Sequence, residues 1–122
     1  MKVFIADDSP IVYERLINML SKLKGIEIIG KAQDVDEATN SIQRLKPDAV
    51  ILDIQMPGGS GIDILKHIKK EQPATVVIIL TNYPYPQYRQ RCMDEGADFF
   101  FDKSTELDKI TRVFKQLVQH PP

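Results

Sequence analysis

Short apolar runs alternate with segments of helical period along the chain. Three of the five runs are unbroken rather than alternating, which is typical of strands buried on both faces of a sheet. Between the runs, apolar residues recur at steps of three and four, as on helices with one buried face. The pattern therefore predicts strands at residues 3–6, 26–29, 49–52, 76–80 and 99–101, each followed by a helix.

The sequence also marks where several helices begin and end. Ser9 is a predicted N-cap, and Pro10 then occupies the first helical position. The segment 83–95 has a thin apolar stripe, and two prolines delay the start of the fourth helix there. The first, second and fourth helices are expected to end at Gly25, Lys46-Pro47 and Gly96.

Strands alternating with helices predict an α/β fold, a doubly wound five-stranded parallel sheet with five helices on its two faces. A length of 122 residues suits one domain. Hydrophobic residues at 43% and charged residues at 27% exclude an intrinsically disordered chain. We expect the domain to span residues 1–119, with residues 120–122 as a C-terminal tail or truncated linker.

Charge and composition limit the kinds of partner that the protein is expected to bind. A net charge of −1 argues against direct binding of nucleic acid or of an anionic membrane. The apolar runs are too short to span a membrane, and the N-terminus does not resemble a signal peptide. Cys92 is the single cysteine, which excludes an intramolecular disulfide. These features predict a cytoplasmic protein.

Polar residues follow four of the predicted strands. Asp7 and Asp8 come after the first strand, Asp53 after the third, Thr81 after the fourth and Lys103 after the fifth. Because ligands of open α/β sheets bind beyond the carboxyl ends of the strands, these side chains are expected to converge on one edge.

Three carboxylates beside one ammonium leave an excess of negative charge at that edge. Either the pKa of one carboxyl group rises, or a cation neutralises the excess. Oxygen ligands in an incomplete cage favour Mg²⁺ over zinc. A carboxylate beside Mg²⁺, a hydroxyl and a lysine is a set of groups suited to phosphoryl transfer.

These residues and their spacing resemble the receiver domains of bacterial two-component response regulators, over essentially the whole chain. The resemblance implies a flavodoxin-like fold with strand order 2-1-3-4-5. It is carried by Asp7-Asp8, by the run from Asp53 to Gly61, by Thr81, and by Gly96-Ala97-Asp98 leading to Lys103.

The resemblance implies a role for each site residue. Asp53 would accept a phosphoryl group from a histidine of a sensor kinase or phosphotransfer protein. Mg²⁺ would be bound by Asp53, directly by Asp8, through water by Asp7 and by the backbone carbonyl of Gln55. Lys103 would pair with one oxygen of the phosphoryl group, and Thr81 would form a hydrogen bond to another.

The resemblance also implies an output surface. Phosphorylation would draw Thr81 inward, with Phe100 at the position of an aromatic switch. The fourth helix, fifth strand and fifth helix would then contact an output domain or effector, or a second copy of the chain. Such a domain assists its own phosphorylation and dephosphorylation and is not a separate enzyme.

Four features depart from the usual family pattern. Ser104 follows Lys103 where proline is common, Asn82 follows Thr81 where a small residue is usual, and Phe100 stands in place of tyrosine. The fourth departure is the run Tyr83-Pro84-Tyr85-Pro86, which with Tyr88 predicts an exposed aromatic surface.

Three other functions compete with this interpretation. A pseudo-receiver scaffold would never take phosphate, and Asn82 keeps that alternative open. A small aspartyl-phosphate phosphatase would carry its nucleophile in an Asp-x-Asp pair after the first strand, unlike Asp7-Asp8. A flavodoxin-like cofactor binder would need a phosphate-binding loop at that place, where two aspartates repel phosphate. His67 and His120 are expected on the surface, and Cys92 is expected to be a buried small hydrophobe.

Overall fold

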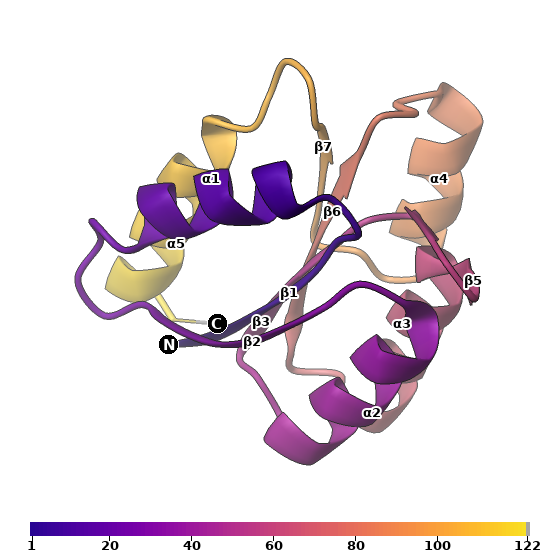
Figure 1. The fold of residues 1–122 in the computed structure, drawn as a ribbon, viewed down its shortest axis with the longest axis horizontal. Coiled ribbons are helices and arrows are strands. Elements are labelled where there is room, and N and C mark those ends of the chain that lie inside the picture. Colours follow the sequence, from indigo (N-terminus) through magenta and orange to yellow (C-terminus); the bar gives the residue numbers. More distant parts are fainter. Residues whose placement is uncertain (122) are drawn as a thin grey trace.

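The computed structural model describes residues 1–121 and contains the five predicted strands in one parallel sheet (Figure 1). Its spatial order is β2-β1-β3-β6-β7, which is 2-1-3-4-5 when the strands of this sheet are counted alone. The predicted fold is therefore confirmed, while Pro122 of the expected tail lies outside the described residues. The strands are β1 (Lys2–Ala6), β2 (Glu27–Ala32), β3 (Ala49–Leu52), β6 (Val76–Thr81) and β7 (Phe99–Asp102).

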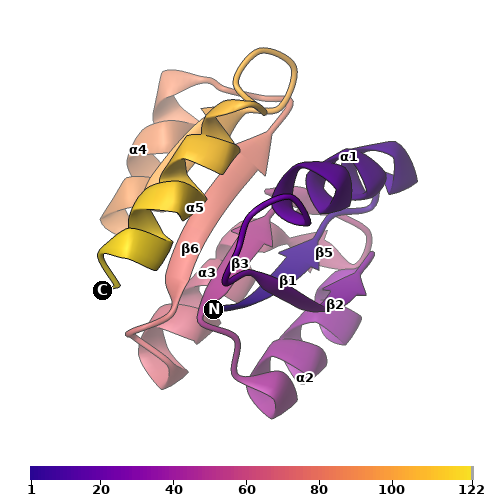
Figure 2. The ribbon, with the colours of Figure 1, turned by 90° about the vertical axis from the view of Figure 1, so that its left-hand side faces the viewer.

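Five helices cover the two faces of this sheet. They are α1 (Pro10–Leu20), α2 (Val35–Leu45), α3 (Gly61–Glu71), α4 (Pro86–Asp94) and α5 (Lys109–Gln119). Helices α1 and α5 lie on one face, and α2, α3 and α4 lie on the other (Figures 1 and 2). Within residues 1–121, the helices are too short or too polar for any of them to cross a membrane.

Alternate residues of the central strands feed two separate cores. In β1, Val3 and Ile5 pack with α1 and α5, whereas Phe4 and Ala6 pack with α2 and α3. Since both faces of β1, β3 and β6 are covered, nearly every residue of these strands is buried. This double burial explains the unbroken apolar runs in the sequence.

Most of the predicted helix ends are confirmed. The Ser9 hydroxyl accepts from the Val12 amide at 3.4 Å, and Lys46 ends α2 in the left-handed conformation with φ of 49°. Gly96 follows the end of α4 with φ of 99°.

The predicted end of the first helix at Gly25 is wrong. Helix α1 ends at Leu20, where the Ser21 amide donates to the Ile17 carbonyl. A turn then keeps Leu23 packed against the same core as the helix. Leu23 thus continues the apolar period of the helix without being helical.

A small element that the pattern missed shapes the loop after β3. Strands β4 (Gln55–Met56) and β5 (Gly59–Ser60) form an antiparallel pair of two residues each, too short to show an apolar period. The Ser60 hydroxyl accepts from the Ile62 amide at 3.1 Å, as expected of the N-cap of α3.

Candidate functional site

Three carboxylates meet at the carboxyl edge of the sheet. Asp7 and Asp8 follow β1 and Asp53 follows β3, and the last residues of these two strands pair side by side. One carboxylate oxygen from each lies within 4.8 Å of the others. Asp7 and Asp53 are buried whereas Asp8 is exposed, so solvent reaches the cluster at Asp8. The predicted convergence of the aspartates is confirmed.

Lys103 supplies a buried positive charge to the same cluster. Its Nζ lies 2.8 Å from Asp7 Oδ2 and 2.9 Å from Asp53 Oδ2. Lys103 follows β7, and β6 separates β7 from β3, so the side chain must reach across the end of one strand. A long lysine stem can span that gap with its ammonium inside and its methylenes packed.

The pKa values of this pair respond to burial and to neighbouring charge. Burial raises the pKa of Asp53, and the opposing influence of Lys103 does not cancel that rise. Burial alone would lower the pKa of Lys103, but the Asp7 and Asp53 carboxylates raise it by more. The lysine is therefore held protonated, while Asp53 carries its negative charge at a cost.

Backbone amides orient the carboxylates. Asp7 Oδ1 accepts from the Ser9 amide at 2.8 Å, and Asp53 Oδ1 accepts from the Gln55 amide at 3.1 Å. Gly61 lies against the backbone of Asp53, and its own amide donates to the Ile54 carbonyl at 2.6 Å. The loop after β3 thus holds the Asp53 carboxylate at the edge of the sheet.

The cluster fits a divalent cation. Three carboxylates lie together at this edge with a single ammonium, which contacts Asp7 Oδ2 at 2.8 Å and Asp53 Oδ2 at 2.9 Å. One ammonium leaves an excess of negative charge among the three carboxylates, which a divalent cation would neutralise. Asp8, which is open to solvent, completes a donor set made of oxygen, as hard cations such as Mg²⁺ prefer.

Thr81 lies fully buried at the same edge, at the end of β6. Its hydroxyl oxygen accepts from the Tyr83 amide at 2.9 Å, and its carbonyl accepts from the Lys103 amide at 2.7 Å. Since the hydroxyl is used here as an acceptor, its proton remains free to be donated.

The aromatic residues near Thr81 divide between core and surface. Phe100 is buried, with the Arg89 guanidinium 5.7 Å from its ring centre. Tyr83 and Tyr85 are exposed and form a tilted row with Tyr88, at ring separations of 6.4 and 5.9 Å. The predicted exposed aromatic surface is present at Tyr83 and Tyr85, whereas Tyr88 is half-buried and packs against the core. Asn82 is also exposed.

The other reactive side chains lie apart from this site. Cys92 is buried, as predicted, and burial raises the pKa of its thiol. The expectation that His67 is a surface residue is only half right. It is half-buried, and within the described chain its Nε2 is buried without a hydrogen bond. His120 is exposed.

Residues just after β7 were missed as contributors to this edge. Ser104 was noted only for replacing proline, yet its amide and hydroxyl both donate to Asp102. An aspartate two residues before a serine is the usual signal for such a turn and could have been recognised. All peptide bonds within residues 1–121 are trans, including Lys103–Ser104.

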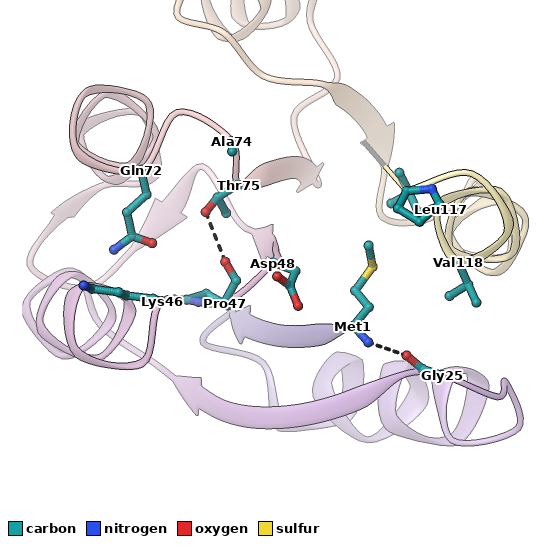
Figure 3. Close-up of a pocket in the computed structure, with 11 residues that line it drawn as sticks. Met1, Gly25, Lys46, Pro47, Asp48, Gln72, Ala74, Thr75, Leu117 and Val118 are labelled. Atoms are coloured by element: carbon teal, nitrogen blue, oxygen red, sulfur yellow. Dashed lines mark hydrogen bonds between the residues drawn. The ribbon is translucent and has the colours of Figure 1, made fainter.

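A cavity of about 650 Å³ lies at the opposite, amino-terminal edge of the sheet (Figure 3). Two of its polar groups are bonded within the protein. Thr75 Oγ1 donates to the Pro47 carbonyl at 3.0 Å, and the Met1 ammonium donates to the Gly25 carbonyl at 2.6 Å. Because the acidic cluster lies at the carboxyl edge, the cavity is separate from it.

Comparison with known proteins agrees with this geometry. Residues 3–115 match the family described as the response regulator receiver domain. The transcriptional regulatory protein YvfU of Bacillus subtilis is 31% identical over 98% of this chain and 60% of its own length. The DNA-binding transcriptional activator EvgA of Escherichia coli is 33% identical over 90% of this chain and 53% of its own. The chain thus spans little more than half the length of these relatives.

Solved structures share the fold. The isolated receiver domain of RcsB from Salmonella enterica, determined with the phosphomimetic BeF₃⁻, is 27% identical with a TM-score of 0.90, covering 98% of this chain and 89% of that one. The response regulator domain of CheB from Thermotoga maritima is 25% identical with a TM-score of 0.84, covering 98% and 93%.

Proposed function

The chain belongs to the receiver domains of two-component response regulators, and on this basis we propose that Asp53 is its phosphoacceptor. The observation that carries the proposal is the buried Lys103 ammonium held against both Asp7 and Asp53. This arrangement supports Asp53 as the nucleophile, Lys103 as a fixed cation and Asp7 and Asp8 as metal ligands at one edge of the sheet. The phosphomimetic reported for the related RcsB domain supports the same chemistry.

In the proposed reaction, a carboxylate oxygen of Asp53 bonds to phosphorus as the bond from phosphorus to a donor histidine nitrogen breaks. The leaving imidazole takes up a proton. Lys103 is already 2.9 Å from Asp53 and pairs with an oxygen of the transferred group. The Thr81 hydroxyl donates a hydrogen bond to a second oxygen of the transferred group. Turning the Thr81 side chain toward that oxygen breaks the bond that its hydroxyl now accepts from the Tyr83 amide.

Asp7, Asp8 and Asp53, with the Gln55 carbonyl, are the proposed ligands of Mg²⁺. When bound, the ion neutralises charge on the phosphoryl oxygens. In its absence Lys103 alone faces three carboxylates, and burial, with a smaller contribution from the Asp7 charge, keeps the pKa of Asp53 raised.

The proposal also covers the binding partners of the domain and its cellular compartment. We propose a sensor histidine kinase or phosphotransfer protein as donor, and a receiver unit spanning residues 1–119. The proposed output face is formed by α4, β7 and α5, where an output domain, an effector or a second copy would bind. A cytoplasmic setting belongs to the same proposal and suits the single thiol of Cys92.

The test is the intact mass of the protein after incubation with acetyl phosphate and Mg²⁺. We expect a gain of one phosphoryl group that is lost in Asp53→Asn and without Mg²⁺. Asp63→Asn, an exposed aspartate on α3, is the matched control and should behave as wild type. A gain that survives Asp53→Asn would overturn the assignment. No gain, even from a histidine phosphodonor protein, would favour the pseudo-receiver scaffold, and hydrolysis of a phosphate ester with turnover would favour the phosphatase.

A further inference from the structure

The Lys103 side chain must be placed with unusual accuracy for a lysine. Its ammonium lies between two buried carboxylates, 2.8 Å from Asp7 and 2.9 Å from Asp53. A lysine has a long stem with many rotamers, so its ammonium is well placed only when the backbone beneath it is fixed. The hydrogen bonds around the Lys103 backbone therefore bear on the chemistry of the site.

The residues on either side of Lys103 are bonded to each other. Asp102 Oδ1 accepts from the Ser104 amide at 2.9 Å and from the Ser104 hydroxyl at 2.7 Å. These two bonds close a ring over Lys103, whose own amide donates to the Thr81 carbonyl at 2.7 Å. The backbone at Lys103 is thus bonded to the end of β6, and the two residues that flank Lys103 are bonded to each other.

Glu106 anchors the same turn from the other side. Its Oε1 accepts from the Asp102 amide at 3.0 Å, and its amide donates to the Asp102 carbonyl at 2.8 Å. Lys109 Nζ holds the second carboxylate oxygen of Glu106 at 2.7 Å. The peptide groups of Asp102 are therefore fixed at both ends, and the first turn of α5 is included in the network.

We propose that Asp102, Ser104 and Glu106 form a lysine clamp that positions the Lys103 ammonium for phosphoryl transfer to Asp53. The inference rests on the proposed function and extends it to residues outside the acidic cluster. Asp102 is the central member because its carboxylate makes both bonds across Lys103. Its bonds to Ser104 lie at the exposed surface, so its action is through hydrogen bonds rather than through its charge, which water screens.

The first test compares Asp102→Ala with Asp102→Asn. Alanine removes the acceptor, whereas the asparagine side-chain oxygen can still accept both bonds from Ser104. We expect the rate at saturating acetyl phosphate and Mg²⁺ to fall about tenfold in Asp102→Ala, as for other residues that orient a reactive group, and to recover in Asp102→Asn. Asp108→Ala, at an exposed aspartate in the same loop, is the matched control. Equal rates in Asp102→Ala and wild type would overturn the clamp, as would an equal loss in Asp102→Asn.

A second variant separates positioning from general damage to the fold. In a Lys103→Ala background, Asp102→Ala should cause no further fall in rate, because the group it positions is gone. A further tenfold fall would show that Asp102 acts by another route and would overturn the proposal.

The clamp can also be tested without phosphorylation. The ¹⁵N-detected ammonium signal of Lys103 should show slow proton exchange in wild type and in Asp102→Asn, and exchange about tenfold faster in Asp102→Ala. Unchanged exchange in Asp102→Ala would contradict the clamp even if wild type takes no phosphoryl group. Absence of phosphorylation with the expected exchange rates would instead contradict only the proposed function.

Discussion

Position 61 allows no side chain, because the backbone that carries Asp53 occupies the space. A Cβ built there would overlap the Asp53 carbonyl oxygen and lie 2.8 Å from the Asp53 carbonyl carbon and 2.9 Å from Ile54 Cα. We expect Gly61→Ala to lower the free energy of unfolding by about 2 kcal/mol, as overpacking typically does. Because relief of the clash must displace Asp53, its phosphorylation should slow as well. Denaturant unfolding and intact mass would check both effects, and a variant with unchanged stability and rate would contradict the close approach.

Asp53 itself is expected to destabilise the metal-free protein. Burial raises its pKa in the folded state, so the stability linked to this group is present at low pH and lost as the pH rises through the folded pKa. At neutral pH the ionised carboxylate therefore costs free energy. Asp53→Asn should raise the free energy of unfolding by about 1 kcal/mol, while Lys103 keeps its contact with Asp7.

The measurement is thermal unfolding of both proteins without Mg²⁺ across a pH series. The gain from Asp53→Asn should shrink toward acid pH, where wild-type Asp53 is itself protonated. If Asp53→Asn is less stable than wild type at neutral pH, the pairing with Lys103 outweighs the cost of burial and the argument fails.

At the level of elements, α4 is the helix least tied to the core. Cys92 is its buried residue, whereas α3 buries five residues along one face. Tyr85 is the N-cap of α4, and within residues 1–121 no side-chain hydrogen bond caps this end of the helix. We expect the amide hydrogens of α4 to exchange at least about tenfold faster than those of α3, since few buried contacts oppose its local opening. Native-state hydrogen exchange would check this, and equal protection of the two helices would contradict it.

The sequence predicts elements well where burial is strong and poorly where loops are tight. Short unbroken apolar runs such as residues 76–80 are typical of strands covered on both faces, and helical crossovers between them make the strands parallel, with their carboxyl ends at one edge. That is why Asp7, Asp53 and Lys103 could be placed together. The end of α1 could not be predicted, because Leu23 packs on the core from a turn as it would from a helix. The partner of the Thr81 hydroxyl depends on the path of the next two residues, which no apolar pattern records.

On the scale of the whole molecule, the protein is almost neutral but its charge is unevenly distributed. The net charge is −1 over the chain, yet one edge of the sheet holds three carboxylates against a single lysine. The two cores on either side of the sheet fix these strand ends rigidly, so the carboxylates cannot move apart to relieve their repulsion. A cation that enters this edge should therefore stabilise the entire fold.

We expect Mg²⁺ to raise the free energy of unfolding of wild type, because it binds the assembled cluster and not the unfolded chain. At ten times the dissociation constant the gain is about 1.4 kcal/mol. Asp8→Asn removes the solvent-facing ligand and should abolish most of the gain, whereas Asp63→Asn, on the surface of α3, should keep it. Thermal unfolding with MgCl₂, matched in ionic strength by NaCl, separates specific binding from screening, which acts alike on all three proteins. A shift of the same size in NaCl, or one that persists in Asp8→Asn, would show that the acidic edge does not bind the ion.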